Sequence, residues 1–435
     1  MLCVVVALLS LLCFSCGKGG SVKTKRTYLI YMDSAEGNAE AVNGDIAELK
    51  RARISADSNV FLLINGSFSG SEGLLPGIIY EIKKGSAEPV ENRELYSGKT
   101  APSLKDFIIW VADNREGTEY DLFLCNTEGS LPGSESFADI SQQVKEGCGQ
   151  SGVKFGFAAL DGGLCANLEN AAAFADCAEY IVASQELTPE CGFDFRAYFK
   201  AEKSKELSSA DLPVILAKCS YKSAAKKYSS DFLTFSVIKT AEAENVAQLA
   251  EKETANKNFC SKELLLFGGK TKDEGFSNMT DILSLFGENK DLKNAVQSAV
   301  VYAKNGASCK NACGMSVYYP YYCDMNENEK QSYRSGCFSD VYAAAVAAIK
   351  GAGISSEEAE KLRYEIDGKV YDCVYCGEGL FYKYYSAFVK KENGKSVNYR
   401  IKVNRLSREA KVSHVVYSYD GKEGKVWGKY AMYGE

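Results

Sequence analysis

A glycine turn at residues 161–165 carries the side chains with the clearest chemical potential in this chain. The run LDGGLCANLENA puts Asp161 directly before two glycines and Cys165 shortly after them. A carboxylate can bind a cationic side chain, and a thiol becomes a nucleophile when a base removes its proton. The sequence contains one histidine, His414, which lies close to the end of the chain. We therefore interpret Cys165 first as a small buried side chain, and second as a nucleophile served by a base other than a nearby histidine.

The turn lies inside a predicted strand–helix–strand unit at residues 153–186. Alternating bulky residues predict the first strand, apolar residues at helical spacing predict the helix, and a β-favouring run predicts the second strand. These are, in order, Val153, Phe155 and Phe157; Leu164, Leu168, Ala171, Ala172 and Ala175; and Tyr180–Ala183. Such a unit implies parallel strands, whose carboxyl ends are where ligands bind in open sheets. We expect Asp161 and the glycines at such an end, with Asp161 also capping a helix that begins near Leu164.

The turn and its surroundings resemble the clostripain family of cysteine peptidases, which has a caspase-like fold. The resemblance rests on LDGGLCANLENA, on AEYIVASQE and GFDF after it, and on GMSVYY further along. The family writes the turn as Asp-Ala-Cys-Leu-Met, with the cysteine as nucleophile. Aligned through Asp161 and Leu164, the nucleophile position holds Gly163, and Cys165 lies two residues further on.

The family's second catalytic position is also changed. The catalytic histidine of the family follows an earlier central strand, and the corresponding sequence here is CNTEGSLPG, with Thr127 at that position. A threonine hydroxyl does not serve as a general base near neutral pH. The resemblance therefore implies a chain without nucleophile or base, and we expect no catalytic residue.

Two acidic residues are the expected ligand contacts. In the family, an aspartate in the segment that resembles GFDF helps to form a pocket for a basic side chain, and Asp194 holds that position. Together with Asp161 it would bind a peptide or protein segment through Arg or Lys. No cofactor or metal is expected, because the cysteines at 309/313 and 373/376 lack the spacing of a zinc ribbon and favour disulfides instead.

Three functions remain open from the sequence. The first is a non-catalytic, clostripain-like pseudopeptidase that holds a basic peptide or a partner protein without cutting it. The second is an active cysteine endopeptidase that cleaves after Arg or Lys with a relocated nucleophile, Cys165. The third is a structural module of the cell envelope whose cleft is unused.

The remaining sequence predicts one α/β domain and a smaller β domain. Apolar runs predict strands at 27–32, 59–65 and 121–126, an edge hairpin at 77–86, and helices at 43–55, from 104 onwards, through much of 207–306 and at 340–352. Ser103 and Asp106 form a predicted capping box. We expect a three-layer caspase-like domain over residues 27–350, with a mostly parallel central sheet flanked by helices. Alternating runs with Asp-Gly and Asn-Gly turns predict an antiparallel β domain over residues 356–435.

The composition and the first residues indicate which partners the protein binds and where it is located. A net charge of −6 without a basic run argues against nucleic acid as a partner. The run MLCVVVALLSLLCFS is too short for a transmembrane helix, which needs about 20 apolar residues, but suits a signal peptide over residues 1–16. Leu12 to Ser15 resembles a lipobox, so Cys16 is the expected lipidation site, followed by a flexible tether at 17–26. The sequence thus predicts a protein of the bacterial cell envelope, anchored to a membrane by lipid or secreted.

Cysteine content fits export. Of the sixteen cysteines, Cys3, Cys13 and Cys16 precede the mature part, which leaves thirteen. An exported chain is expected to pair several of them, including at least one pair among residues 309, 313, 323 and 337. The odd number leaves at least one thiol unpaired.

We predict that Cys16 becomes the lipid-bearing amino terminus of the mature protein. Cleavage after Ser15 would expose its thiol for acylation, and two or more chains would give stable membrane attachment. Mass spectrometry of the amino-terminal peptide measures this directly. An unmodified terminus elsewhere, or retention of Met1, contradicts lipidation.

Overall fold

The computed structural model describes most of the chain from residue 26 to residue 433. The described ranges are 26–34, 39–66, 73–90, 102–115, 119–125, 135–189, 191–203, 207–228, 230–255, 264–268, 279–287, 289–319, 338–342, 344, 362–366, 369–378, 382–390, 395–404, 410–418 and 430–433. The predicted leader, Cys16, the tether up to residue 25 and Thr127 lie outside these ranges. Within the described ranges, no helix is both long and apolar enough to cross a membrane.

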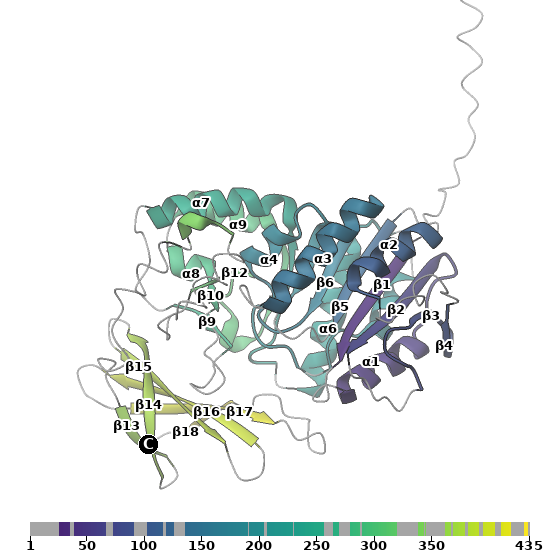
Figure 1. Ribbon diagram of the computed structural model, residues 1–435. Coiled ribbons are helices and arrows are strands. Elements are labelled where there is room, and N and C mark those ends of the chain that lie inside the picture. The colour runs from purple at the N-terminus through teal and green to yellow at the C-terminus, as the bar shows by residue number, and fades with distance from the viewer. Residues whose placement is uncertain are drawn as a thin grey trace, which may run out of the picture.

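A nine-stranded sheet forms the centre of the described α/β part (Figure 1). Its strand order is β11-β8-β7-β6-β5-β1-β2-β3-β4. The strands are β1 (Arg26–Ser34), β2 (Ser58–Gly66), β3 (Ile79–Lys83), β4 (Ser86–Pro89), β5 (Glu119–Cys125), β6 (Phe155–Asp161), β7 (Ala178–Ala183), β8 (Thr234–Lys239) and β11 (Val300–Asn305). The pairs from β2 through β1, β5 and β6 to β7 are parallel, whereas β3, β4, β8 and β11 join antiparallel. The prediction of a mostly parallel central sheet is confirmed.

Helices cover both faces of this sheet and form a three-layer sandwich (Figure 1). One face packs against α1 (Ala39–Arg51), α5 (Phe195–Glu202) and α6 (Asp211–Lys227). The other face packs against α2 (Leu104–Asn114), α3 (Glu135–Ser151), α4 (Leu168–Ala173), α7 (Ala243–Ala255) and α9 (Lys290–Ala299). Because both faces are buried, the central strands are continuous apolar runs whose side chains alternate between the two cores.

Two further sheets complete the described structure. A small antiparallel sheet of β9 (Leu266–Phe267), β10 (Met279–Asp281) and β12 (Ser316–Tyr318) continues into α8 (Ile282–Phe286) from β10. The C-terminal part forms a six-stranded antiparallel sheet. Its strands are β13 (Leu362–Ile366), β14 (Lys369–Glu378), β15 (Tyr382–Lys390), β16 (Lys395–Asn404), β17 (Ala410–Ser418) and β18 (Tyr430–Tyr433). The predicted antiparallel character of this region is confirmed.

Predictions that rest on short sequence motifs are confirmed at α2 and at the β3–β4 hairpin. The capping box at α2 is present as predicted: the Ser103 side chain accepts from the Asp106 N–H, and the Asp106 carboxylate accepts from the Ser103 N–H. The predicted core face of α2 is likewise buried. The edge hairpin is β3–β4.

Three predictions of secondary structure were wrong or incomplete. Leu164 does not begin a helix, because its φ is 68°, and α4 starts only at Leu168 with Asn167 rather than Asp161 as N-cap. The segment after Ala299, predicted as helix, is the edge strand β11. Strand β8 lies within residues 207–306, which were predicted to be largely helical, and helix α3 had no prediction. The predicted helix at 340–352 lies largely outside the described residues.

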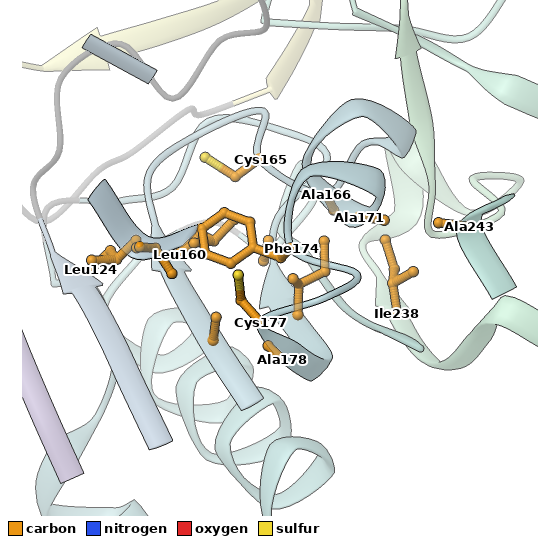
Figure 2. Close-up of a cluster of buried hydrophobic side chains, with 14 of the residues drawn as sticks. Leu124, Leu160, Cys165, Ala166, Ala171, Phe174, Cys177, Ala178, Ile238 and Ala243 are labelled. Carbon is orange, nitrogen blue, oxygen red and sulfur yellow. The ribbon is translucent and has the colours of Figure 1, made fainter. Parts of the chain in front are cut away.

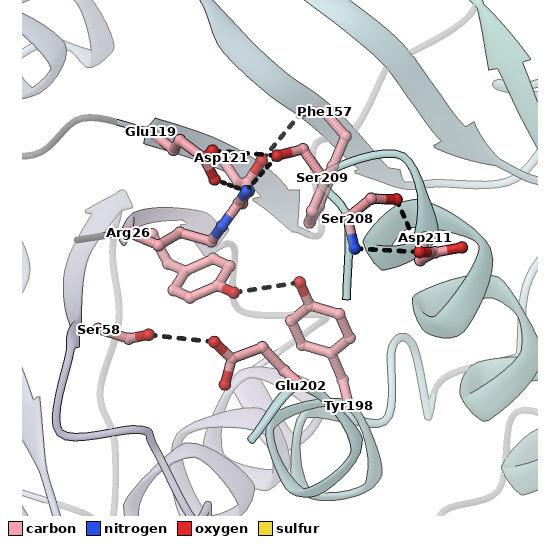
Figure 3. A network of polar contacts seen from close by, with 11 residues as sticks. Arg26, Ser58, Glu119, Asp121, Phe157, Tyr198, Glu202, Ser208, Ser209 and Asp211 are labelled. Atoms are coloured by element: carbon pink, nitrogen blue, oxygen red, sulfur yellow. Dashed lines mark hydrogen bonds and ion pairs between the residues drawn. The ribbon is translucent and has the colours of Figure 1, made fainter. Parts of the chain in front are cut away.

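A buried ion pair fastens β1 to β5 at the amino edge of the sheet (Figure 3). The Arg26 Nη1 atom lies 2.5 Å from Oδ2 of Asp121, whose side chain is fully buried, and Arg26 also contacts Glu119 and Ser209. The other Asp121 oxygen, Oδ1, accepts the Phe157 N–H at 3.0 Å. Burial raises the pKa of Asp121, and the Arg26 charge opposes that rise. The carboxylate is thus stabilised by its partners, although it is removed from water.

We predict that Arg26→Met strongly destabilises the protein. Loss of the cation would leave Asp121 buried without its counter-charge, at a cost of about 3–5 kcal/mol in the free energy of unfolding. The double variant Arg26→Met/Asp121→Asn should lose less than the sum of the single variants. Urea unfolding monitored by circular dichroism measures these differences. As a matched control, Lys83→Met removes an exposed pair with Glu88 and should change stability little; equal effects at Lys83 and Arg26 would contradict the assignment.

Candidate functional site

Three central strands end at the same edge of the sheet. Strand β6 ends at Asp161, which is paired with Cys125 at the end of β5, and β7 ends at Ala183 beside it. The chain then continues into the post-β6 turn (residues 161–167) and the post-β7 segment (residues 184–188). The sequence correctly predicted that Asp161 and Gly163 lie at the carboxyl end of a parallel strand. Thr127, which follows β5, lies outside the described residues.

Backbone hydrogen bonds fix the post-β6 turn between two neighbours. The Leu164 N–H donates to Glu186 O at 3.2 Å, and the Ala166 N–H donates to Ser184 O at 2.9 Å. On the other side, the Ser316 N–H of β12 donates to Ala166 O at 2.9 Å. The turn therefore behaves as an extra extended segment that joins the main sheet to the small one.

Gly163 has no room for a side chain. A Cβ atom built on Gly163 would lie 2.7 Å from the Leu187 Cα atom, 2.8 Å from Leu187 Cδ2 and 3.3 Å from the Thr188 nitrogen. Backbone atoms cannot move aside as a flexible side chain can, so any residue larger than glycine requires the post-β7 segment to shift. The position that the resemblance assigns to a nucleophile is thus closed by the neighbouring chain.

Leu164 is held in a backbone conformation that side chains disfavour. Among the described residues other than glycine, Leu164 is the one with positive φ. This left-handed conformation costs about 1–2 kcal/mol for an ordinary residue. The Leu164 side chain is buried in a separate cluster with Phe232 and Phe267, and Asn167 donates its side-chain N–H to Leu164 O at 2.8 Å. Strain of this kind gathers at functional turns, which marks the turn as a candidate site.

Cys165 is enclosed in the core rather than open to solvent. Its exposed fraction is 0%, and it belongs to the same cluster as Leu160, Ala166 and Phe174 (Figure 2). The thiol lies 3.4 Å from Gly163 O. A substrate carbonyl cannot reach a fully buried sulfur without local unfolding, so the geometry favours the interpretation of Cys165 as a small core residue.

Asp161 is a buried acid in a tight setting. It is 7% exposed, and its pKa is raised to about 7 because burial disfavours the carboxylate, while a hydrogen bond from the Phe193 N–H opposes the rise. Gly192 adopts a φ of +48°, and a Cβ atom there would lie 2.2 Å from Asp161 Oδ2. The chain after β7 therefore closes on Asp161 at a point where only glycine fits. A group that changes charge near neutral pH and lies at a strand end is a candidate binding group.

Asp194 caps the amino end of a helix. It is the N-cap of α5, where Oδ1 accepts the Ala197 N–H at 2.8 Å, and its own N–H donates to Ser220 Oγ at 3.2 Å. Asp194 follows directly after Phe193, the residue whose N–H binds Asp161. The structure thus brings the two predicted acidic residues into one neighbourhood, with one carboxylate engaged as a helix cap.

Sequence reasoning missed the polar residues that hold the post-β7 segment in place. Glu186 Oε1 accepts the N–H groups of Leu187 at 2.9 Å and Gly268 at 2.7 Å. Gln185 is fully buried; its Nε2 donates to Asp281 Oδ2 at 3.2 Å, and its Oε1 accepts the Gly314 N–H at 2.8 Å. The run SQE directly after an apolar strand was the available signal, because three polar residues at a buried strand end need partners.

A second buried acid lies beneath the turn. Glu169 on α4 is 2% exposed, and burial raises its pKa to about 7. Its Oε1 accepts the Tyr318 N–H at 3.0 Å, whereas Oε2 is buried without a hydrogen-bond partner. This carboxyl links α4 to β12 and helps to hold the small sheet against the turn.

The other candidate groups lie elsewhere or contact backbone carbonyls. His414 lies in β17, paired with Tyr399 and Ala431, as a sheet residue of the C-terminal part. Cys309 and Cys313 are not bonded to each other, and their thiols contact Phe232 O and Met315 O. Among the described residues, no group of three or more His, Cys, Asp or Glu side chains is arranged to hold a metal ion.

Comparisons with known proteins agree on the fold. No protein-family model and no curated protein sequence matches the chain. A secreted C11 cysteine protease from Bacteroides thetaiotaomicron, solved with an irreversible peptide inhibitor, is similar with a TM-score of 0.55 and 17% identity; the match covers 74% of this chain and 99% of that one. An inactive zymogen C11 protease from Parabacteroides distasonis is similar with a TM-score of 0.54 and 17% identity, over 73% and 99% of the two chains. The chain described here therefore has the caspase-like fold of the C11, or clostripain-family, cysteine proteases.

Proposed function

We propose that this protein is a C11-like pseudopeptidase of the cell envelope, which binds a peptide or protein segment and does not hydrolyse it. One observation carries the proposal: the position assigned to the nucleophile is Gly163, and Leu187 lies so close that a Cβ atom would be 2.7 Å from its Cα. The loss of the nucleophile is thus accompanied by a filled site, as expected of a chain that has ceased to need a reactive side chain there.

The alternatives for covalent catalysis are poorly supported by the geometry. A cysteine peptidase needs an exposed thiol, a base within hydrogen-bond reach and a place for the substrate carbonyl. Cys165 is fully buried, and the single histidine lies in β17 of the C-terminal sheet. Thr127, at the position assigned to the base, has a hydroxyl that is not basic at neutral pH.

Binding can persist where catalysis is lost. Asp161 lies at the strand ends, and a cationic side chain nearby would favour its ionised form. We propose Asp161 as the principal acidic contact for Arg or Lys, with the Asp194 charge as a weaker contribution because its Oδ1 already caps α5. The solved C11 protease bound to a peptide inhibitor supports a peptide as the ligand class.

The proposed location of the protein rests on its sequence and on the similar solved structures. Residues 1–16 would be a lipoprotein signal peptide, residues 17–26 a tether, 27–350 the C11-like domain and 356–435 the β-rich domain. The similar C11 protease from Bacteroides thetaiotaomicron is secreted, which supports an extracytoplasmic location. Arg26 is the first residue of β1 and ends the proposed tether. A force on a membrane anchor would therefore act on a strand that the Arg26–Asp121 ion pair joins to β5.

We predict that the purified protein does not cleave peptides after Arg or Lys, even with reductant and calcium. The variant Gly163→Cys/Thr127→His should also remain inactive, because the new Cβ at position 163 would collide with Leu187. Release of a fluorophore from Arg and Lys substrates measures cleavage. Activity in the parent that disappears in Cys165→Ala would replace the proposal with the relocated-nucleophile alternative.

A stability measurement tests whether the space beside Gly163 is filled by Leu187, independently of any measurement of cleavage. Gly163→Ala should lower the free energy of unfolding by roughly 1–3 kcal/mol, as other overpacking substitutions do. Gly149→Ala is the matched control, since a Cβ atom at Gly149 meets nothing within 4 Å. If Gly163→Ala were as stable as the parent, the space beside residue 163 would be open. The variant Gly163→Cys/Thr127→His would then be tested for cleavage of a wider set of peptides.

We predict that affinity for a basic peptide rises with pH. Asp161 has a pKa of about 7, so it is largely neutral at pH 6 and ionised at pH 8, and a cationic ligand prefers the ionised state. An arginine peptide should therefore bind up to about tenfold more tightly at pH 8 than at pH 6. Each unit by which the bound cation lowers the pKa of Asp161 corresponds to a tenfold change in affinity. The same peptide with citrulline should lack this dependence. Fluorescence anisotropy measures both.

Variants at the two acids test the same prediction. Asp161→Asn should lower the affinity for the arginine peptide by roughly 1.5–3 kcal/mol and remove the pH dependence. Asp194→Asn keeps a capping side chain on α5, so stability should hold while affinity falls less. Equal affinity for the arginine and citrulline peptides at both pH values would contradict an acidic pocket.

A further inference from the structure

Two buried thiols contact each other away from the strand-end site. Cys148 lies in the last turn of α3, and Cys177 lies in the turn between α4 and β7. Their exposed fractions are 8% and 2%, and both belong to the core cluster on the same face of the sheet. The two side chains are hydrogen-bonded to each other. Cys177 lies in the cluster drawn in Figure 2.

The backbone around each cysteine is fixed. The Gly152 N–H donates to Cys148 O at 2.8 Å, and the Phe155 N–H donates to Cys177 O at 2.8 Å. Helix α3 packs closely on α2 beside Cys148, because a Cβ atom at Gly147 would lie 3.0 Å from Ile108 Cβ. The contact between the sulfurs is therefore set by the two chain segments and does not depend on a mobile loop.

The thiols also differ in acidity. The hydrogen bond from Cys148 lowers the pKa of Cys177, with Lys145 and Lys154 contributing in the same direction. The same contact, together with burial, raises the pKa of Cys148. Lys145 and Lys154 thus favour the thiolate form of Cys177. A thiolate is the attacking species in thiol–disulfide exchange.

Other described thiols have different partners. Cys165 contacts Gly163 O, and Cys313 contacts Met315 O. A contact between two thiols is the arrangement from which a disulfide forms with little movement, provided that the backbone positions allow it.

We propose that Cys148 and Cys177 form a disulfide when the exported chain folds in an oxidising compartment. The oxidant is a disulfide of an exchange partner, either a small molecule or a protein. The Cys177 thiolate attacks one partner sulfur and releases the other as a thiolate, and the Cys148 sulfur, after losing its proton, then attacks Cys177 and releases the second. One disulfide is made, one is reduced to two thiols, and both protons pass to the released thiolates.

The bond would fasten the part of the chain that carries the site. It closes a loop from residue 148 to residue 177, which contains β6, the post-β6 turn and α4. Cross-linking a loop restricts the unfolded chain and so favours the folded one. Because both sulfurs are nearly buried, reduction should require local opening, and the bond should resist reductants in the native protein. This inference is independent of the proposed peptide binding.

Peptide mapping without reduction tests the proposal. The full chain is refolded from denaturant in a glutathione redox buffer, its remaining thiols are alkylated, and it is digested after Lys, Arg and Glu. Residues 147–154 and 170–179 then form peptides with one cysteine each, Cys148 and Cys177. We expect these two peptides as one cross-linked species that separates on reduction. Recovery of both as alkylated single peptides, or of either joined to another cysteine, overturns the proposal.

Variants provide a second readout. Cys148→Ala/Cys177→Ala should lose the cross-linked species, whereas Cys125→Ala, the matched control at a third buried thiol, should keep it. The drop in Tm caused by a strong reductant should be several degrees larger in Cys125→Ala than in the double variant. An equal drop in both, without a cross-linked peptide in the parent, would likewise overturn the proposal.

Discussion

The approach of Leu187 to Gly163 constrains everything at the strand ends. The post-β6 turn and the post-β7 segment are joined by backbone hydrogen bonds from Leu164 to Glu186 and from Ala166 to Ser184. Bonds of this kind require the two segments to lie as close as adjacent strands, and glycine is the residue that allows the remaining approach at position 163. Leu164, which donates one of these hydrogen bonds, has the left-handed φ of 68°. A reactive side chain at this position and this arrangement of the two segments exclude each other.

The closed turn is supported from several directions. Glu186 accepts the N–H groups of Leu187 and Gly268, and Gln185 reaches the small sheet through Asp281 and Gly314. These residues are buried, so each lost hydrogen bond would leave a polar group without water or partner. Opening the site would therefore disturb the small sheet as well as the turn. The peptide contact proposed above is with Asp161, which is 7% exposed while the turn is closed.

The sequence predicted what short-range rules control. The alternation in β6, the capping box of Ser103 and Asp106, and the position of Asp161 at a strand end follow from patterns within a few residues. The positive φ of Leu164 and the closed space at Gly163 depend on residues 184–188, which no local pattern connects to the turn. The helix predicted beyond Ala299 is a strand because an open edge of β8 is available to pair with it. Tertiary contacts overrode local propensity at each of these points.

Buried acids are treated differently at the two edges of the sheet. At the amino edge, Asp121 has a cation and a backbone N–H as partners; burial raises its pKa to about 6, and the Arg26 charge opposes that rise. At the carboxyl edge, Asp161 and Glu169 have backbone donors but no cation among the contacts described above, and burial raises the pKa of each to about 7. An acid with a raised pKa weakens the folded state as the pH rises through that value, since the unfolded chain ionises at lower pH. A cation beside Asp161 would lower its pKa again, which is the role proposed above for the Arg or Lys side chain of a peptide ligand.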